Sequence, residues 1–83
     1  MALFMGMHTI DGGILIEDVA AAHMVDLAVQ GGHGVRYLRY WVDERDGKVF
    51  CLVEAPSGEA VASVHRQAGG LVADKIYQVK EGV

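Results

Sequence analysis

The residues best suited to chemistry in this chain are its four histidines, His8, His23, His33 and His65, which occur within 83 residues. Neutral imidazole is a favoured ligand for nickel, copper and zinc, and a metal site needs several such groups within a few ångströms of one another. No pair has the i, i+4 spacing of a helical metal site, and there is no C-x-x-C motif. The alternative is structural: each helix histidine packs at the margin of the core and hydrogen-bonds a neighbour.

Two of these histidines occupy the same position in a short internal repeat. Residues 17–23 and 59–65 both fit E-x-V-A-x-x-H. The repeat predicts that His23 and His65 lie at similar depths on neighbouring helices. Asp26 follows His23 by three residues on the same helical side, so it is either an acceptor that orients that imidazole or a solvated helix carboxylate.

Two further residues are candidates for a supporting role. Glu54 ends an apolar run, where its carboxylate either faces a cavity beside the metal ligands or simply precedes the turn. Cys51 lies among apolar residues and is expected to be a small, buried and inert core residue. The sequence contains no G-x-S-x-G, H-E-x-x-H, P-loop or dinucleotide fingerprint, so no catalytic motif favours an enzyme.

The elements that position these residues follow from apolar periodicity and from glycine pairs. Strands are expected over 2–9, 35–43, 49–55 and 74–81, with helices over 16–29 and from Pro56-Ser57 to Gly69-Gly70. This order predicts one α+β domain over 1–83 with a ferredoxin-like βαββαβ fold. Its four-stranded antiparallel sheet carries both helices on one face.

The other face of the sheet is expected to be covered. In the run 35–43, one alternate set is Tyr37, Arg39 and Trp41, and the other is Leu38, Tyr40 and Val42. Neither set is plainly polar, although a sheet with one face in water should alternate cleanly. With 52% hydrophobic residues in the chain, the pattern predicts a symmetric homodimer, a dimeric α+β barrel or sandwich.

Charge and composition exclude several classes of partner. The net charge is −4 and the arginines are dispersed, so neither nucleic acid nor an anionic membrane is an expected partner. The single cysteine suits a reducing compartment. The apolar N-terminus lacks the features of a signal peptide, and no run is long enough to span a membrane. The expected location is the cytoplasm.

The chain resembles a family of small bacterial proteins over nearly its whole length. The similar stretches are 3–8, 17–23, 26–30, 34–43, 48–56 and 70–74, and the most specific are the hairpin and the turn Glu54-Ala55-Pro56. Leu15 stands where relatives commonly carry a threonine that caps the first helix. The family, formerly of unknown function, includes a nickel-binding, nickel-responsive protein. The resemblance implies a ferredoxin-like dimer that binds nickel through His8, His23 and His65, with a role in sequestration or detoxification.

Function hypotheses from three classes follow. The favoured one is a homodimeric metal-binding protein with no catalytic cycle, which holds nickel or, alternatively, zinc or copper. The second is a small cavity enzyme of the isomerase or monooxygenase kind, with His8, Glu54 and Trp41 around an apolar substrate; only fold analogy supports it. The third is a ligand-sensing or structural module.

Overall fold

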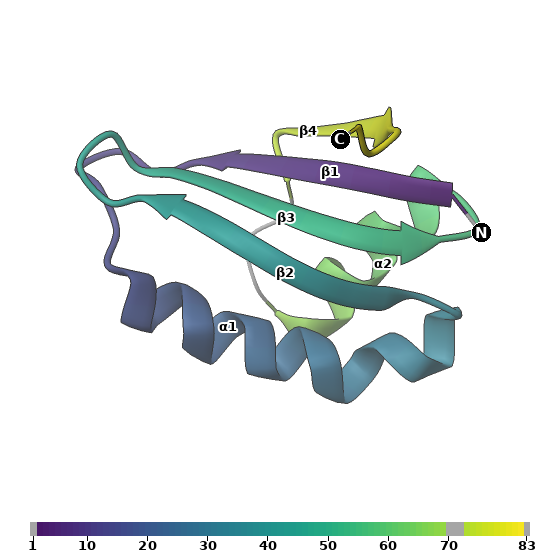
Figure 1. The fold of residues 1–83 in the computed structure, drawn as a ribbon. Coiled ribbons are helices and arrows are strands. Elements are labelled where there is room, and N and C mark those ends of the chain that lie inside the picture. Colours follow the sequence, from purple (N-terminus) through teal and green to yellow (C-terminus); the bar gives the residue numbers. More distant parts are fainter. Residues whose placement is uncertain (1, 70–72, 83) are drawn as a thin grey trace.

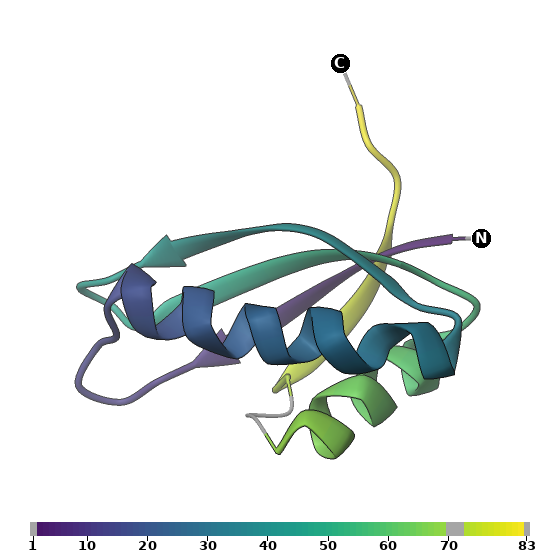
Figure 2. The ribbon, with the colours of Figure 1, turned by 90° about the horizontal axis from the view of Figure 1, so that it is seen from below.

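The computed structural model describes residues 2–69 and 73–82. Within them the elements are β1 (Ala2–Thr9), α1 (Ile16–Val29), the short 3₁₀ helix η1 (Gln30–His33), β2 (Arg36–Asp43), β3 (Lys48–Ala55), α2 (Gly58–Ala68) and β4 (Lys75–Val79). The strands form an antiparallel sheet in the order β2-β3-β1-β4. Both helices lie on the same face of this sheet (Figures 1 and 2). The predicted ferredoxin-like α+β fold is confirmed.

The predicted element boundaries differ from the observed ones by few residues. Both β1 and α1 have the predicted limits, whereas β2 begins one residue later, at Arg36, and β3 one residue earlier, at Lys48. The last strand is shorter than expected and covers only Lys75–Val79. Gly70, expected with Gly69 to end the second helix, lies outside the described residues.

Helix α2 begins and ends as its sequence predicts. The Ser57 hydroxyl accepts a hydrogen bond from the Ala60 N–H at 3.2 Å, which satisfies one of the free donors of the first turn. Gly69 ends the helix in the left-handed region, at φ 73°, and its N–H donates to the carbonyl of Arg66. A residue without Cβ adopts this conformation at little cost. His65 is thereby placed in the last turn of the helix.

Helix α1 begins with no capping side chain of its own at Leu15. Glu44, in the β2–β3 hairpin, supplies the missing acceptor, since its carboxylate accepts from the Ile16 N–H at 2.8 Å. The same hairpin holds the loop before α1, where the Ile10 N–H donates to the Gly47 carbonyl at 2.7 Å. Gly47 has a φ of 67°, and a Cβ there would collide with the Ile10 carbonyl oxygen. The start of α1 therefore depends on a distant turn.

The core lies between the sheet and the two helices. Val53, Val61 and Val64 are fully buried there. The cluster around them consists of Phe4, Val19, Val35, Tyr37, Val49, Cys51 and Ala55. Burial of these side chains supplies the main driving force for folding, as expected for apolar surface removed from water.

Strand β2 contains a bulge that the sequence analysis did not anticipate. Tyr37 lies opposite Val53 and Arg39 lies opposite Leu52, so Leu38 is an extra residue in the ladder. Because an extra residue shifts the alternation by one, Tyr37 and Tyr40 both pack on the core side. The prediction that Tyr37 shares a face with Arg39 and Trp41 is wrong for this reason.

The face of the sheet away from the helices carries large apolar side chains among charged ones. Trp41 is 47% exposed. A shallow depression of about 300 Å³ on this face is lined by Leu3, Met5, Arg39, Trp41, Leu52, Val79, Lys80 and Glu81. As expected from the sequence, polar and apolar side chains are mixed on this face. No helix in the described part of the chain is long and apolar enough to cross a membrane.

Candidate functional site

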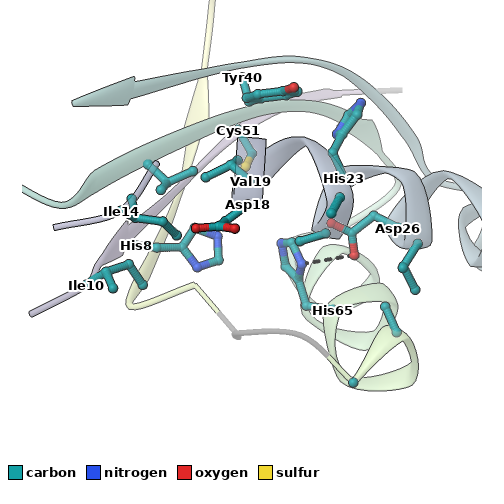
Figure 3. Close-up of a pocket in the computed structure, with 16 residues that line it drawn as sticks. His8, Ile10, Ile14, Asp18, Val19, His23, Asp26, Tyr40, Cys51 and His65 are labelled. Atoms are coloured by element: carbon teal, nitrogen blue, oxygen red, sulfur yellow. Dashed lines mark ion pairs between the residues drawn. The ribbon is translucent and has the colours of Figure 1, made fainter. Parts of the chain in front are cut away.

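A pocket of about 460 Å³ lies between the sheet and the two helices. His8, His23 and His65, the three histidines proposed as ligands from the sequence, all line it (Figure 3). They come from β1, α1 and α2, so the pocket collects residues that are far apart in the chain. The rest of its lining is mostly aliphatic, apart from Asp18, Asp26, Tyr40 and Cys51.

The three rings lie at different depths. His8 and His65 are buried, and their ring centroids are 5.1 Å apart in an edge-to-face arrangement. His23 is only half-buried, and its ring centroid is 4.8 Å from that of Tyr40. The two histidines of the internal repeat, His23 and His65, therefore lie in one pocket. The prediction that they lie at similar depths is wrong. Helix α1 lies closer to solvent at His23 than α2 does at His65.

Asp26 contacts His65 and not the histidine on its own helix. Its Oδ1 lies 3.3 Å from Nδ1 of His65, and both residues are buried. The other ring nitrogen of His65, Nε2, lies 3.0 Å from the hydroxyl of Tyr37. His65 is thus held at both nitrogens, by a carboxylate from α1 and a phenol from β2.

Burial keeps two of the histidines neutral. The pKa of His8 is lowered, first by burial and then by the nearby His65, against the opposing charges of Asp74 and Asp26. Burial also lowers the pKa of His23, against the attraction of Asp26. Because the charged form of an imidazole is disfavoured in an apolar pocket, both rings present a lone pair at neutral pH.

Cys51 is buried on β3, as predicted, and lines the same pocket. Burial, with a smaller contribution from Asp26, raises the pKa of its thiol to about 12. The group is therefore a protonated thiol at neutral pH, with the low reactivity expected of a structural cysteine.

Glu54 and His33 lie away from this pocket. Glu54 pairs with Arg36 at 3.6 Å, between the ends of β2 and β3. His33 belongs to η1 and hydrogen-bonds Gln67 of α2. Of the two carboxylates proposed to support the ligands, the structure therefore brings only Asp26 to the histidines.

Tyr37 is the residue at this site that the sequence analysis missed. Strict alternation along β2 grouped it with Arg39 and Trp41, and the bulge at Leu38 separates it from them. No residue type around Leu38 marks this bulge, so the sequence offered no signal for the face of Tyr37.

The donor set suits a borderline metal ion such as nickel, because imidazole nitrogens predominate. In the described residues, however, no group of three or more His, Cys, Asp and Glu side chains converges as a metal centre does. The three histidines share a cavity wall, and their rings do not yet point at one position (Figure 3).

Comparison with known proteins places this chain in a family. Residues 4–79 match the family described as SCO4226-like, nickel responsive protein SCO4226-like. The crystal structure of SCO4226 from Streptomyces coelicolor A3(2) is similar, with a TM-score of 0.90 and 39% sequence identity, over 99% of this chain and 100% of that one. No curated protein matches. The resemblance noted from the sequence is confirmed, and this chain belongs to the SCO4226-like family of nickel-responsive proteins.

Proposed function

We propose that this protein binds nickel through His8, His23 and His65 and serves in nickel sequestration or detoxification. The observation that carries the proposal is the shared pocket, because three histidines chosen from the sequence line the same cavity. The nickel responsiveness in the family description supports a metal-related role over the cavity enzyme. The single cysteine suits a reducing compartment, so the proposed location is the cytoplasm.

The chemistry of the pocket agrees with this role. Metal-binding histidines usually donate their second ring N–H to a carboxylate, which fixes the ring orientation. Asp26 is within reach of Nδ1 of His65 for that purpose. Since the rings of the three ligands do not converge on one point, nickel binding requires side-chain rotation in the pocket. Zinc and copper prefer the same donors and are the competing ions.

Titration of single variants with nickel tests the proposal. Loss of a residue that hydrogen-bonds a metal ligand typically weakens metal binding by roughly tenfold or more. Loss of a ligand itself, in His8→Ala, His23→Ala or His65→Ala, should weaken nickel binding by more than that. His33→Ala is the matched control, because His33 contacts Gln67 outside the pocket, and it should bind as the wild type does. Elemental analysis of protein purified without a histidine tag should find stoichiometric metal. Unchanged binding after loss of both His23 and His65 contradicts the site assignment.

The proposal includes a homodimer formed through the open face of the sheet. Trp41 and Tyr77 are large and exposed there, next to Leu3, Met5 and Val79. Contiguous apolar surface of this kind on a small protein marks an interaction site. A two-fold arrangement would bury the same patch on both copies.

A further inference from the structure

His65 is the most constrained of the three proposed ligands. Its exposed fraction is 4%, and its two polar partners, Asp26 at 6% and Tyr37 at 4%, are buried with it. We call this arrangement the Asp26–His65–Tyr37 chain. Its contacts measure 3.3 Å at Nδ1 and 3.0 Å at Nε2, so neither ring nitrogen is free.

The chemistry of the partners decides which tautomer of His65 a metal ion could use. A metal can bind Nε2 only in a neutral ring with its proton on Nδ1, and the Asp26 carboxylate, 3.3 Å from Nδ1, is an acceptor that favours this tautomer. In this tautomer Nε2 has a lone pair, and the Tyr37 hydroxyl, 3.0 Å away, is its donor. A tyrosine phenol keeps its proton at neutral pH, so it is a donor here. The lone pair that a metal would use is therefore occupied.

The Tyr37 hydroxyl has a second acceptor close by. The Tyr37 hydroxyl also donates to the backbone carbonyl of Val61, one turn earlier on α2, at 3.4 Å. When Nε2 is taken by another partner, Val61 still accepts the phenol proton, so no buried donor is left unsatisfied. The chain thus has one closed arrangement, in which Tyr37 contacts both Nε2 and Val61, and one open arrangement, in which Tyr37 bonds Val61 alone.

We propose that Tyr37 competes with the metal ion for Nε2 of His65 and so sets the affinity of the site. The inference rests on the proposed nickel function and adds a positioning residue to it. It also explains why the three histidines line one pocket without converging, since His65 is held by Tyr37 while the metal is absent. The bulge at Leu38 turns Tyr37 toward the helices and so brings its hydroxyl to His65.

Nickel titration of Tyr37→Phe, with Tyr77→Phe as the control, tests the competition. Both substitutions keep the ring and remove one hydroxyl. Tyr37 contacts His65, whereas Tyr77 is 48% exposed on the opposite face of the sheet, outside the pocket. Tyr37→Phe should bind nickel about fivefold more tightly, the factor that corresponds to one ordinary hydrogen bond. Tyr77→Phe should bind within about twofold of the wild type. In a His65→Ala background, Tyr37→Phe should have no effect.

Two measurements on the wild type make the test independent of how well the variants fold. In the metal-free protein, ¹⁵N NMR should show His65 protonated at Nδ1 with a hydrogen-bonded Nε2. Nickel should perturb the ultraviolet absorbance of tyrosine as Tyr37 leaves Nε2 and bonds Val61 alone. Unchanged or weaker nickel binding by Tyr37→Phe, or an Nε2–H form of His65, overturns the inference while the nickel function stands. A wild type that binds no nickel overturns both.

Discussion

Tyr37 and Tyr40 face the same side of the sheet although they are three residues apart in one strand. The extra residue between them, Leu38, breaks the alternation and turns two aromatic side chains toward the helices. Tyr37 thereby reaches His65, and Tyr40 reaches His23. A local irregularity in β2 thus determines which polar groups surround the proposed ligands.

Deleting Leu38 should therefore be far more harmful than truncating it. The deletion restores strict alternation and moves either Tyr37 or Tyr40 out of the core, so the free energy of unfolding should fall by more than about 4 kcal/mol. Leu38→Ala keeps the bulge and removes only a half-buried side chain, so it should cost roughly 1 kcal/mol. Urea denaturation of both variants measures the difference. Equal losses would mean that the bulge has no structural importance.

Nickel affinity should persist to a lower pH than free histidine would allow. Protons compete with the metal for the imidazole lone pair, and the pKa values of His8 and His23 lie below the ordinary value of 6.5. Their neutral forms therefore remain dominant at that pH, and the affinity should fall only as the pH drops further. Calorimetric titrations at about pH 8, 6.5 and 5 check this expectation. A loss of half the affinity above pH 6.5 would contradict it.

Cys51 should react slowly with a thiol reagent in the native protein. With the thiol pKa raised to about 12, little thiolate exists near neutral pH, and the side chain is buried as well. Labelling at about pH 8 should be on the order of a thousandfold slower than in denaturant, from the thiolate fraction alone. Rapid native labelling that nickel suppresses would instead make Cys51 a ligand.

The open face of the sheet should hold two copies of the chain together. Sedimentation equilibrium at micromolar concentration should give twice the chain mass of 8.9 kDa. Trp41→Glu places a charge in the middle of the proposed interface and should yield a monomer. Met24→Glu is the control, since Met24 is 71% exposed on the outer side of α1, away from the sheet. A monomeric wild type, or a monomer produced by Met24→Glu alone, would remove this interface.

Local patterns predicted the elements well because their signals lie within a few residues of each boundary. Ser57 and Gly69 mark the ends of α2 by their own chemistry, and both roles were predictable. The partner of Asp26 was not, because helical spacing pointed to His23 and only the packing of α1 against α2 brings His65 within 3.3 Å. The face of Tyr37 was mispredicted since no residue type announces a bulge at Leu38.

Histidine content and the family resemblance pointed to His8, His23 and His65 as ligands, and the three side chains line one pocket. These sequence features could not predict the pairing of Glu54 with Arg36, because that contact depends on the register of β2 against β3. Residues that act alone are visible in a sequence, whereas residues that act through a neighbour on another element need the packed structure.

The hydrogen bond from the Ile16 N–H to the Glu44 carboxylate links the opening of the pocket wall to the opening of the hairpin. The first turn of α1 finds its acceptor only after β2 and β3 have paired, so the helix that carries His23 and Asp26 cannot complete itself locally. The wall of the pocket should consequently open and close as one cooperative unit with the hairpin. Hydrogen exchange should give the amides of Ile16 and of central β3 residues a shared opening free energy, and separate values would show that α1 frays alone.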